Sequence, residues 1–181
     1  MTSPATPTAI DMSNPSRWLA VLRILLGLWF VKALWSKMDV VLLGGFFPFL
    51  EVEPRWIAKM PELVAKQATE NPLLWYKAFL EQTVLTHAGL YAHFTAWGEV
   101  LVGLSLTLGV FAGLGALGGL WLSLNYGLAS QHLSPASLGF HYLLVVVMAI
   151  LFLARSGRAL GLDAWIAWRW PGSWVTRRPV Q

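Results

Sequence analysis

The sequence predicts an all-α integral membrane protein: a four-transmembrane-helix bundle with an amphipathic outer connection and a C-terminal interfacial helix. Hydrophobic residues make up 56% of the 181 residues and charged residues only 12%, which is too few for an ordinary soluble surface. Residues 100–154 contain no Asp, Glu, Lys or Arg, so they cannot form such a surface. Most of the eleven tryptophans fall near the ends of apolar runs, as in the aromatic belts of membrane proteins.

Composition also excludes several functional classes. The net charge of +4 comes from basic residues that flank apolar runs, a pattern typical of membrane topology and not of nucleic-acid binding. The chain has no cysteine, which excludes disulfides, thiolate metal sites, iron–sulfur clusters, covalently bound haem and thiol catalysis. No nucleotide-binding, hydrolase or metalloprotease motif occurs. We predict no metal and no haem.

The first spanning helix is predicted at residues 18–43, after a flexible tail of residues 1–16 that is rich in Pro, Ser and Thr. Four charged residues interrupt this span: Arg23, Lys32, Lys37 and Asp39. Arg23 lies near the start and is expected to snorkel outward to the interface. Lys32 lies near the middle of the span, where its ammonium cannot reach either interface.

A long amphipathic connection is predicted to follow, because Gly44-Gly45 and Pro48 end the apolar run. Residues 55–70 are predicted to form a surface helix, and Pro61 is the position at which it would break. A second amphipathic segment, residues 73–85, is expected to lie on the membrane surface or over the mouth of the bundle.

Three further spans are predicted at residues 90–109, 111–129 and 138–154. Gly115 and Gly119 are spaced to let the third span approach a neighbouring backbone closely. An interfacial helix at residues 160–175 and a basic tail at residues 176–181 complete the chain. Residues 17–175 therefore form one predicted membrane domain.

Basic residues predict the orientation of the domain. Arginines are concentrated before or early in the first span and after the fourth: Arg17, Arg23, Arg155, Arg158, Arg169, Arg177 and Arg178. The long connection holds fewer basic residues, namely Arg55, Lys59, Lys66 and Lys77. We expect a multi-pass protein of a prokaryotic inner (plasma) membrane with both termini in the cytoplasm.

Glu99 is the central candidate for function, because a carboxylate at the middle of a span needs a partner or a wet cavity. Comparison of depths along the four spans gives Lys32 as its first candidate partner and Lys37 as its second. Other polar and aromatic candidates share the central and outer layers: His93, Trp97, Asn125, Tyr126 and His141. We therefore expect a polar pocket that opens toward the outer face.

Two interpretations of this pocket stay open. Glu99 and a lysine form either a buried ion pair that only fixes the helices, or a site at which Glu99 exchanges protons with a bound quinone. Quinone carbonyls would accept hydrogen bonds from lysine or histidine, and the quinone ring would stack on Trp97 or Trp35. A b-type haem would need His93 and His141 to face inward at matching depth.

Several short motifs follow one another in the order of the predicted helices. They are Arg23–Phe30 with Ser36-Lys37, Trp75–Leu80 with Val84–Ala88, Gly98-Glu99 with Leu108-Gly109, Asn125-Tyr126, and Ser156–Arg158 with Gly161–Asp163. From Arg23 to Trp168 the series resembles the DoxX/DoxD family of small four-helix membrane proteins. The chain departs from the family pattern at Leu34, where a glycine is frequent, and at Lys32, which is an extra charge.

The resemblance implies a quinone-associated subunit of a membrane oxidoreductase complex, and DoxD specifically implies a thiosulfate:quinone oxidoreductase. It also marks Arg158 and Asp163 as motif residues, which we expect to form a salt bridge at the inner face. Whether the chain has enzymatic activity of its own is left open. The alternatives are an accessory or assembly subunit without catalysis, and a transporter or channel, which the absence of repeats disfavours.

Overall fold

A computed structural model describes residues 14–181 of the protein, so most of the predicted N-terminal tail lies outside the described residues. Its last residues belong to the first helix, α1 (Pro15–Val31). Asn14 caps this helix, since its Oδ1 accepts a hydrogen bond from the Ser16 N–H at 3.0 Å. An asparagine followed by proline is a common helix start, and α1 therefore begins before residue 18.

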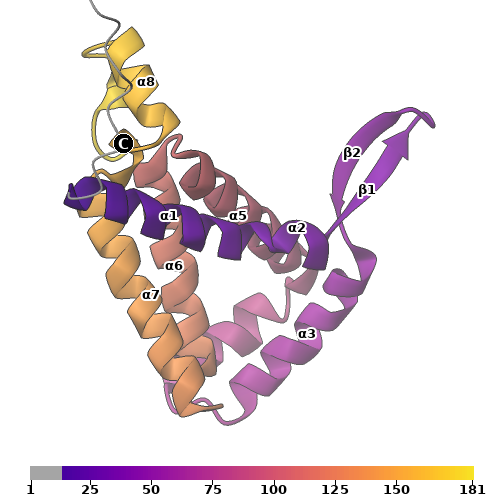
Figure 1. Cartoon of the computed structure of the whole chain (residues 1–181). Helices are drawn as coiled ribbons and strands as arrows, with labels where there is room; N and C mark the ends of the chain where they lie inside the picture. The colour runs from indigo at the N-terminus through magenta and orange to yellow at the C-terminus, as the bar shows by residue number, and fades with distance from the viewer. Residues whose placement is uncertain (1–13) are drawn as a thin grey trace, which may run out of the picture.

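The long helices pack as two antiparallel pairs. Helix α1 lies against α5 (Ala88–Leu108), and α6 (Ala112–Ser130) lies against α7 (Pro135–Leu153). Figure 1 shows the α1–α5 pair running across the α6–α7 pair instead of alongside it, and α5 joins the two pairs through its contact with α6. Residues at the same depth in two of these helices, as counted along the sequence, therefore need not lie close together in space.

Two of the described helical segments are long and apolar enough to cross a membrane: Pro15–Ser36 and Pro135–Leu153. Only 28% and 17% of their apolar windows are buried, whereas the core helix of a soluble protein would be mostly buried. Their outward apolar surfaces suit contact with lipid. That α5 and α6 also span the membrane stays a prediction.

The first span ends earlier than predicted. After α1 and a short helix α2 (Ala33–Ser36), the chain forms a β-hairpin of β1 (Met38–Leu43) and β2 (Phe47–Val52), which extends from the body in Figure 1. Gly44 and Gly45 have positive φ angles of 64° and 83° and make the hairpin turn. The prediction of helix to residue 43 was wrong because a short apolar run fits a strand as well as a helix.

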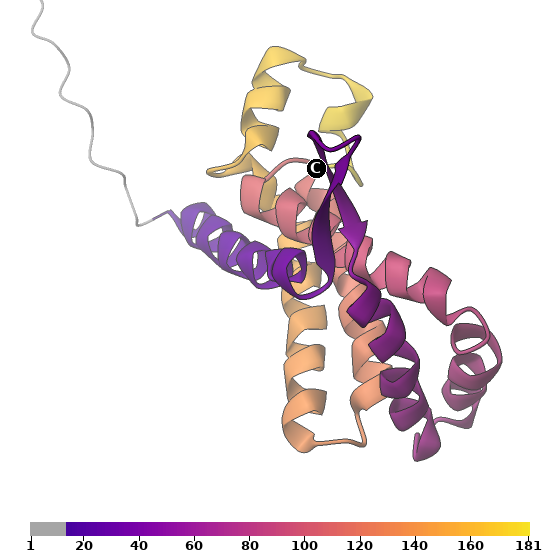
Figure 2. The same ribbon diagram turned by 90° about the vertical axis from the view of Figure 1, so that its right-hand side faces the viewer.

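The outer connection is mostly helical, as predicted. It consists of α3 (Pro54–Thr69), α4 (Leu74–Phe79) and a π-helical turn at Leu80–Val84. Helix α3 continues through Pro61 without a break. Its buried residues recur every four positions, Met60, Val64 and Ala68, and pack on a cluster that includes Tyr76 and Ala92. Figure 2 shows this connection beside α5 and α6.

The C-terminal region packs against the helix pairs. A 3₁₀ turn (Ser156–Arg158), α8 (Leu162–Arg169) and a second turn (Trp174–Thr176) follow α7. Helix α8 is shorter than the predicted interfacial helix, although its tryptophans are exposed as expected. The predicted basic tail, residues 176–181, folds back, and the Val180 carbonyl accepts a hydrogen bond from the Gly113 N–H at 3.1 Å.

Glycines set the close approach of α1 and α5. A Cβ atom on Gly103 would overlap the backbone of Val31, and one on Gly27 would overlap the backbone of Thr107. Gly115 and Gly119 are also closely packed, but against side chains and not a backbone, because a Cβ there would overlap the side chains of Ser105 and Met148. Small residues thus allow backbone contact between helices.

We expect Gly103→Ala to lower the free energy of unfolding by about 1–3 kcal/mol, because backbone atoms of α1 must move away. Gly139→Ala is the matched control, since a Cβ on Gly139 meets nothing within 4 Å. Both changes gain the same helix propensity, so their difference isolates the contact. Unfolding of the detergent-solubilised protein by SDS, followed by circular dichroism, measures it. Equal stability of the two variants would contradict the packing.

Candidate functional site

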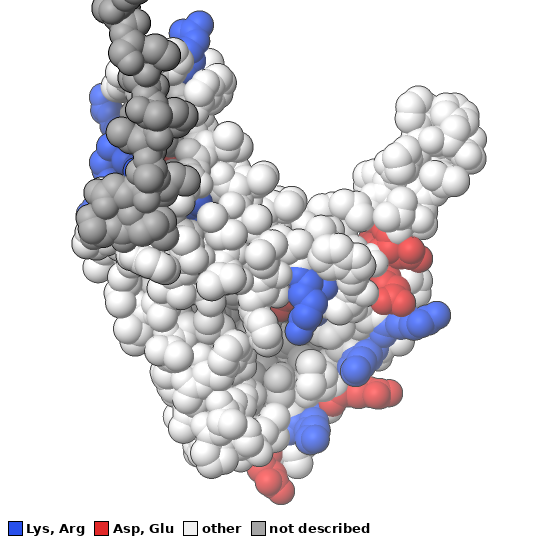
Figure 3. Space-filling model, viewed as in Figure 1, with Lys and Arg blue, Asp and Glu red and all other residues white. Residues whose placement is uncertain are grey.

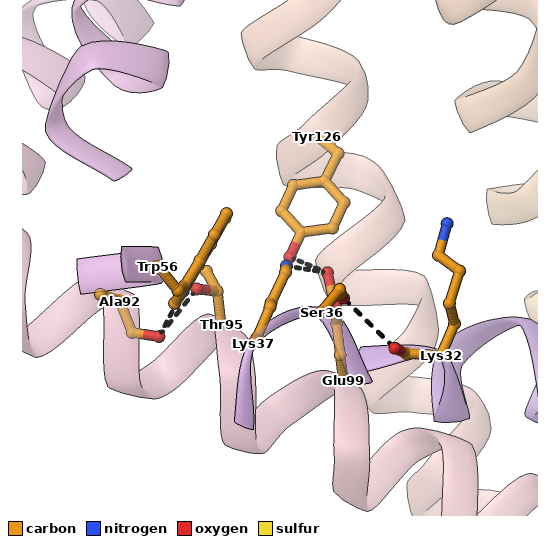
Figure 4. A network of polar contacts seen from close by, with 8 residues as sticks. All are labelled: Lys32, Ser36, Lys37, Trp56, Ala92, Thr95, Glu99 and Tyr126. Carbon is orange, nitrogen blue, oxygen red and sulfur yellow. Dashed lines mark hydrogen bonds and ion pairs between the residues drawn. The ribbon is translucent and has the colours of Figure 1, made fainter. Parts of the chain in front are cut away.

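The polar centre of the molecule is an ion pair between Lys37 and Glu99. The Lys37 Nζ lies 2.8 Å from the Glu99 Oε1, and both side chains are largely buried, with 13% and 14% exposure. The Tyr126 hydroxyl donates a second hydrogen bond to the same oxygen at 2.6 Å. Figure 4 shows Lys37 and Tyr126 converging on Glu99 from different elements, the end of α2 and helix α6.

An aromatic side chain from the outer connection completes the environment of Lys37. The Lys37 ammonium lies 4.1 Å from the centre of the Trp56 ring, within cation–π range. The Trp56 Nε1–H in turn donates to the Ala92 carbonyl of α5 at 3.1 Å. The network therefore ties α2, α3, α5 and α6 together at one point.

The expected first partner of Glu99, Lys32, does not make that contact. Lys32 is exposed, and its ammonium lies 4.6 Å above the ring of Trp29 on the same helix. Figure 4 shows its side chain directed away from Glu99. The choice of Lys32 was wrong because it assumed that the four helices run side by side. The break after α1 instead turns Lys37 inward.

The other predicted site residues are only partly brought together. His93 is exposed, and its Nδ1 contacts the Gly89 carbonyl of its own helix at 2.7 Å. Trp97 packs at the edge of a hydrophobic cluster. His141 lies edge-on to the Tyr126 ring, with centroids 5.9 Å apart. Asn125 faces a cavity next to the network.

This cavity has a volume of about 530 Å³ and lies between α3, α4, α5 and α6. Most of its lining is apolar or aromatic, for example Met60, Phe79, Leu80, Phe94 and Leu122. Tyr126 lines it and also binds Glu99, so the ion pair lies directly behind one wall. Its size and lining are those of a site for a small organic ligand.

Few of the side chains that line the cavity are polar. The Tyr76 hydroxyl donates to the Asn125 backbone carbonyl at 3.0 Å. Burial, together with neighbouring Tyr91, raises the pKa of Tyr76 to about 12, so this hydroxyl keeps its proton at neutral pH. Tyr91 and Gln67 also line the cavity.

A second buried polar centre lies at the opposite end of α1. Arg23 is completely buried instead of snorkelling outward, and donates to the backbone carbonyls of Ser156, Ala159 and Leu160 at 2.6–3.3 Å. The reason is that the turn after α7 folds over Arg23 and supplies carbonyl acceptors in place of water.

Asp163 caps the N-terminus of α6 instead of pairing with Arg158. Its two carboxylate oxygens accept hydrogen bonds from the Phe111 and Ala112 N–H groups at 2.8 and 2.9 Å. Burial raises the pKa of Asp163, and these two donors oppose the shift. Arg158 donates to the Thr176 carbonyl at 2.9 Å, and the part of the chain that the structure describes has no ion pair between Arg158 and Asp163.

Sequence reasoning did not identify the aromatic partners of the ion pair. Tyr126 was predicted to share the pocket layers with Glu99 but not to bind it, and Trp56 and Tyr76 were assigned to an outer amphipathic layer. Their positions depend on contacts between elements far apart in the chain. Within residues 14–181, no group of three or more His, Asp or Glu side chains is placed to hold a metal ion.

A comparison with protein-family models matches residues 64–174 to the model described as "TQO small subunit DoxD". The match covers more than half of the chain, from the middle of α3 to the turn after α8. The chain belongs to the DoxD family. This confirms the family resemblance and, with the two apolar helices, indicates a membrane protein.

The DoxD match contains Glu99, Tyr126 and most of the cavity lining, whereas Lys37 and Trp56 lie before it. The network is therefore shared between the matched region and the preceding segment. Searches of curated proteins and of solved structures gave no match to this chain.

Proposed function

We propose that this DoxD protein is a quinone-binding subunit of a membrane oxidoreductase complex of the thiosulfate:quinone type, with the quinone head group in the cavity beside Tyr126. One observation carries the proposal: the Lys37–Glu99–Tyr126 network abuts a largely apolar cavity of about 530 Å³. The family description, a small subunit of a TQO enzyme, supports the same assignment.

The residues of the cavity fit a quinone. Apolar and aromatic side chains such as Phe79, Phe94 and Leu122 would hold the ring and the start of an isoprenoid chain. Tyr91 and Gln67 line the same cavity, and their hydroxyl and amide groups would be donors for the carbonyl oxygens. A bound quinone would supply a two-electron, two-proton acceptor.

The chain's own contribution is to hold and move a proton. The Glu99 carboxylate accepts a hydrogen bond from the Tyr126 hydroxyl, and Tyr126 lines the cavity. A proton can therefore pass between the cavity and Glu99 through one tyrosine. Lys37 stabilises the negative charge on Glu99, and the Trp56 ring covers the ammonium. An electron donor would have to come from a partner subunit.

Glu99→Gln is expected to weaken the binding of decylubiquinone or a menaquinone analogue by about tenfold, because the Tyr126 hydroxyl loses its charged acceptor and shifts in the cavity. Glu62→Gln makes the same chemical change at an exposed position of α3 and should leave the affinity unchanged. Titration of the full chain in lipid nanodiscs, followed by tryptophan fluorescence, measures both. Absence of binding by the unsubstituted protein would refute the proposal.

A second candidate is an accessory subunit without chemistry of its own. The β-hairpin supports it, because residues 40–49 carry no charge and expose large apolar side chains: Val40, Leu42, Leu43, Phe46, Phe47 and Phe49. An open hairpin edge is unstable in lipid hydrocarbon, so a partner subunit is the better cover for it. Unchanged quinone binding in Glu99→Gln, with stable co-purification of a larger complex, would favour this candidate.

For the membrane orientation we propose both termini in the cytoplasm of a prokaryotic cell, with the outer connection on the opposite side. The arginines after α7 support this, as expected for the inner end of a span. Figure 3 shows that the acidic side chains on the visible face lie mainly at the end that holds the outer connection.

A further inference from the structure

A small polar cavity lies where α1 begins and α7 ends, at the end of the molecule away from the hairpin. It has a volume of about 270 Å³, and its lining includes Ser16, Arg155, Ser156 and Arg158. It is separate from the cavity beside Tyr126, and the proposed function uses none of its residues.

Positive charge converges on this cavity. Arg155 and Arg158 line it, and Arg178 lies close enough to repel Arg155. Burial and these two neighbours lower the pKa of Arg155. No carboxylate within residues 14–181 lies at ion-pair distance from any of the three arginines. Figure 3 shows basic side chains gathered at this end of the visible face.

Unused hydrogen-bond groups accompany the charge. The Arg155 Nε is inaccessible to solvent and lacks a partner within the described chain. The same holds for the Ser156 Oγ, on a residue that is only 4% exposed. In contrast, Arg158 donates a hydrogen bond to the Thr176 carbonyl at 2.9 Å, and Arg178 donates one to the Leu153 carbonyl at 2.8 Å. A buried donor without a partner is costly unless a ligand satisfies it.

The cavity also lies at the ends of two long helices. The first turn of α1, with Ser16, borders it, and the dipole of a 17-residue helix adds positive potential at its N-terminus. Helix α1 begins here and α7 ends here, and both belong to segments that are long and apolar enough to cross a membrane. Lipid phosphates lie at the ends of such spans, and basic pockets between helices on this side bind them.

We infer that this cavity is a binding site for a phosphate oxyanion, carried by the headgroup of an anionic phospholipid or free in solution. Arg155 and the Ser156 hydroxyl would be its direct donors, and Arg158 and Arg178 would supply the surrounding positive charge. Such an anion would also cross-link the start of α1 to the end of α7.

Calorimetric titration of the full chain in a zwitterionic detergent tests this inference with three probes: short-chain phosphatidylglycerol, inorganic phosphate and a short-chain diacylglycerol without phosphate. We expect one or both phosphate probes to bind and the diacylglycerol not to bind. Binding of phosphatidylglycerol alone identifies the lipid headgroup, and binding of inorganic phosphate alone identifies a free anion. Binding of neither phosphate probe overturns the site.

Arg155→Gln should weaken binding of the active probe by about tenfold, as expected for loss of one charge-assisted hydrogen bond. Arg155→Lys keeps the positive charge but lacks the planar guanidinium group, and it should therefore recover only part of the affinity. Arg169→Gln, an exposed position on α8, is the matched control. Circular dichroism confirms that each variant is folded. Unchanged affinity in a folded Arg155→Gln protein would overturn the assignment.

Discussion

Arg23→Leu is expected to lower the free energy of unfolding by about 3–5 kcal/mol, because it leaves buried carbonyl groups without a donor. Arg23 is completely buried and bonds to the carbonyls of Ser156, Ala159 and Leu160. Leucine fills part of the space but has no donor. SDS titration of the detergent-solubilised protein, followed by circular dichroism, gives the difference.

Arg55→Leu is the control for this change. Arg55 is exposed, and its ion pair with Glu53, at 3.5 Å, is a surface contact. Its substitution should alter the stability by no more than about 0.5 kcal/mol. Hydrogen exchange at residues 156–163 should also accelerate in Arg23→Leu, because Arg23 holds that turn. Equal stability of the two variants would mean that the carbonyls find other donors.

Lys37→Met is the second change with a large expected effect, about 3–5 kcal/mol, because it leaves the Glu99 carboxylate buried without its cation. The double variant Lys37→Met/Glu99→Leu should recover much of this loss, since no unpaired charge remains. A double-mutant cycle by SDS unfolding measures the coupling between the two residues.

The exposed pair Lys77–Glu81 gives a matched cycle within the same chain. Its atoms are 3.8 Å apart, and its side chains are 33% and 46% exposed. The coupling there should be no more than about 0.5 kcal/mol. If Lys37–Glu99 couples as weakly as Lys77–Glu81, the ion pair is solvated, and the site lacks the dry environment that proton transfer through Tyr126 requires.

Predictions from the sequence were most accurate where a single segment decides the outcome. The boundaries of α5 and α6 differ from the predicted spans by one or two residues, because caps and glycines mark their ends. In the first span the same reasoning failed after Ser36. Val40 and Val41 with the Gly-Gly pair indicated a hairpin, but the apolar length of the run was taken as helix.

The candidate site was predictable in its central residue and not in its partners. Glu99 stands out because a carboxylate in an apolar helix needs compensation. Which lysine provides it depends on where α1 ends and how it crosses α5, and those two helices are fixed by contacts at Gly27 and Gly103. Tyr126 comes from α6, 27 residues further along the chain.

The sequence by itself determined the apolar helical class, the long helices and the importance of Glu99, because length, hydropathy and helix caps act within a segment. Only the tertiary structure decided that Lys37 pairs with Glu99, that Asp163 caps α6, and that Arg23 is buried under the turn after α7. These contacts join residues that are 51 to 137 positions apart along the chain. Such contacts depend on the rotation and crossing of helices, which no local pattern encodes.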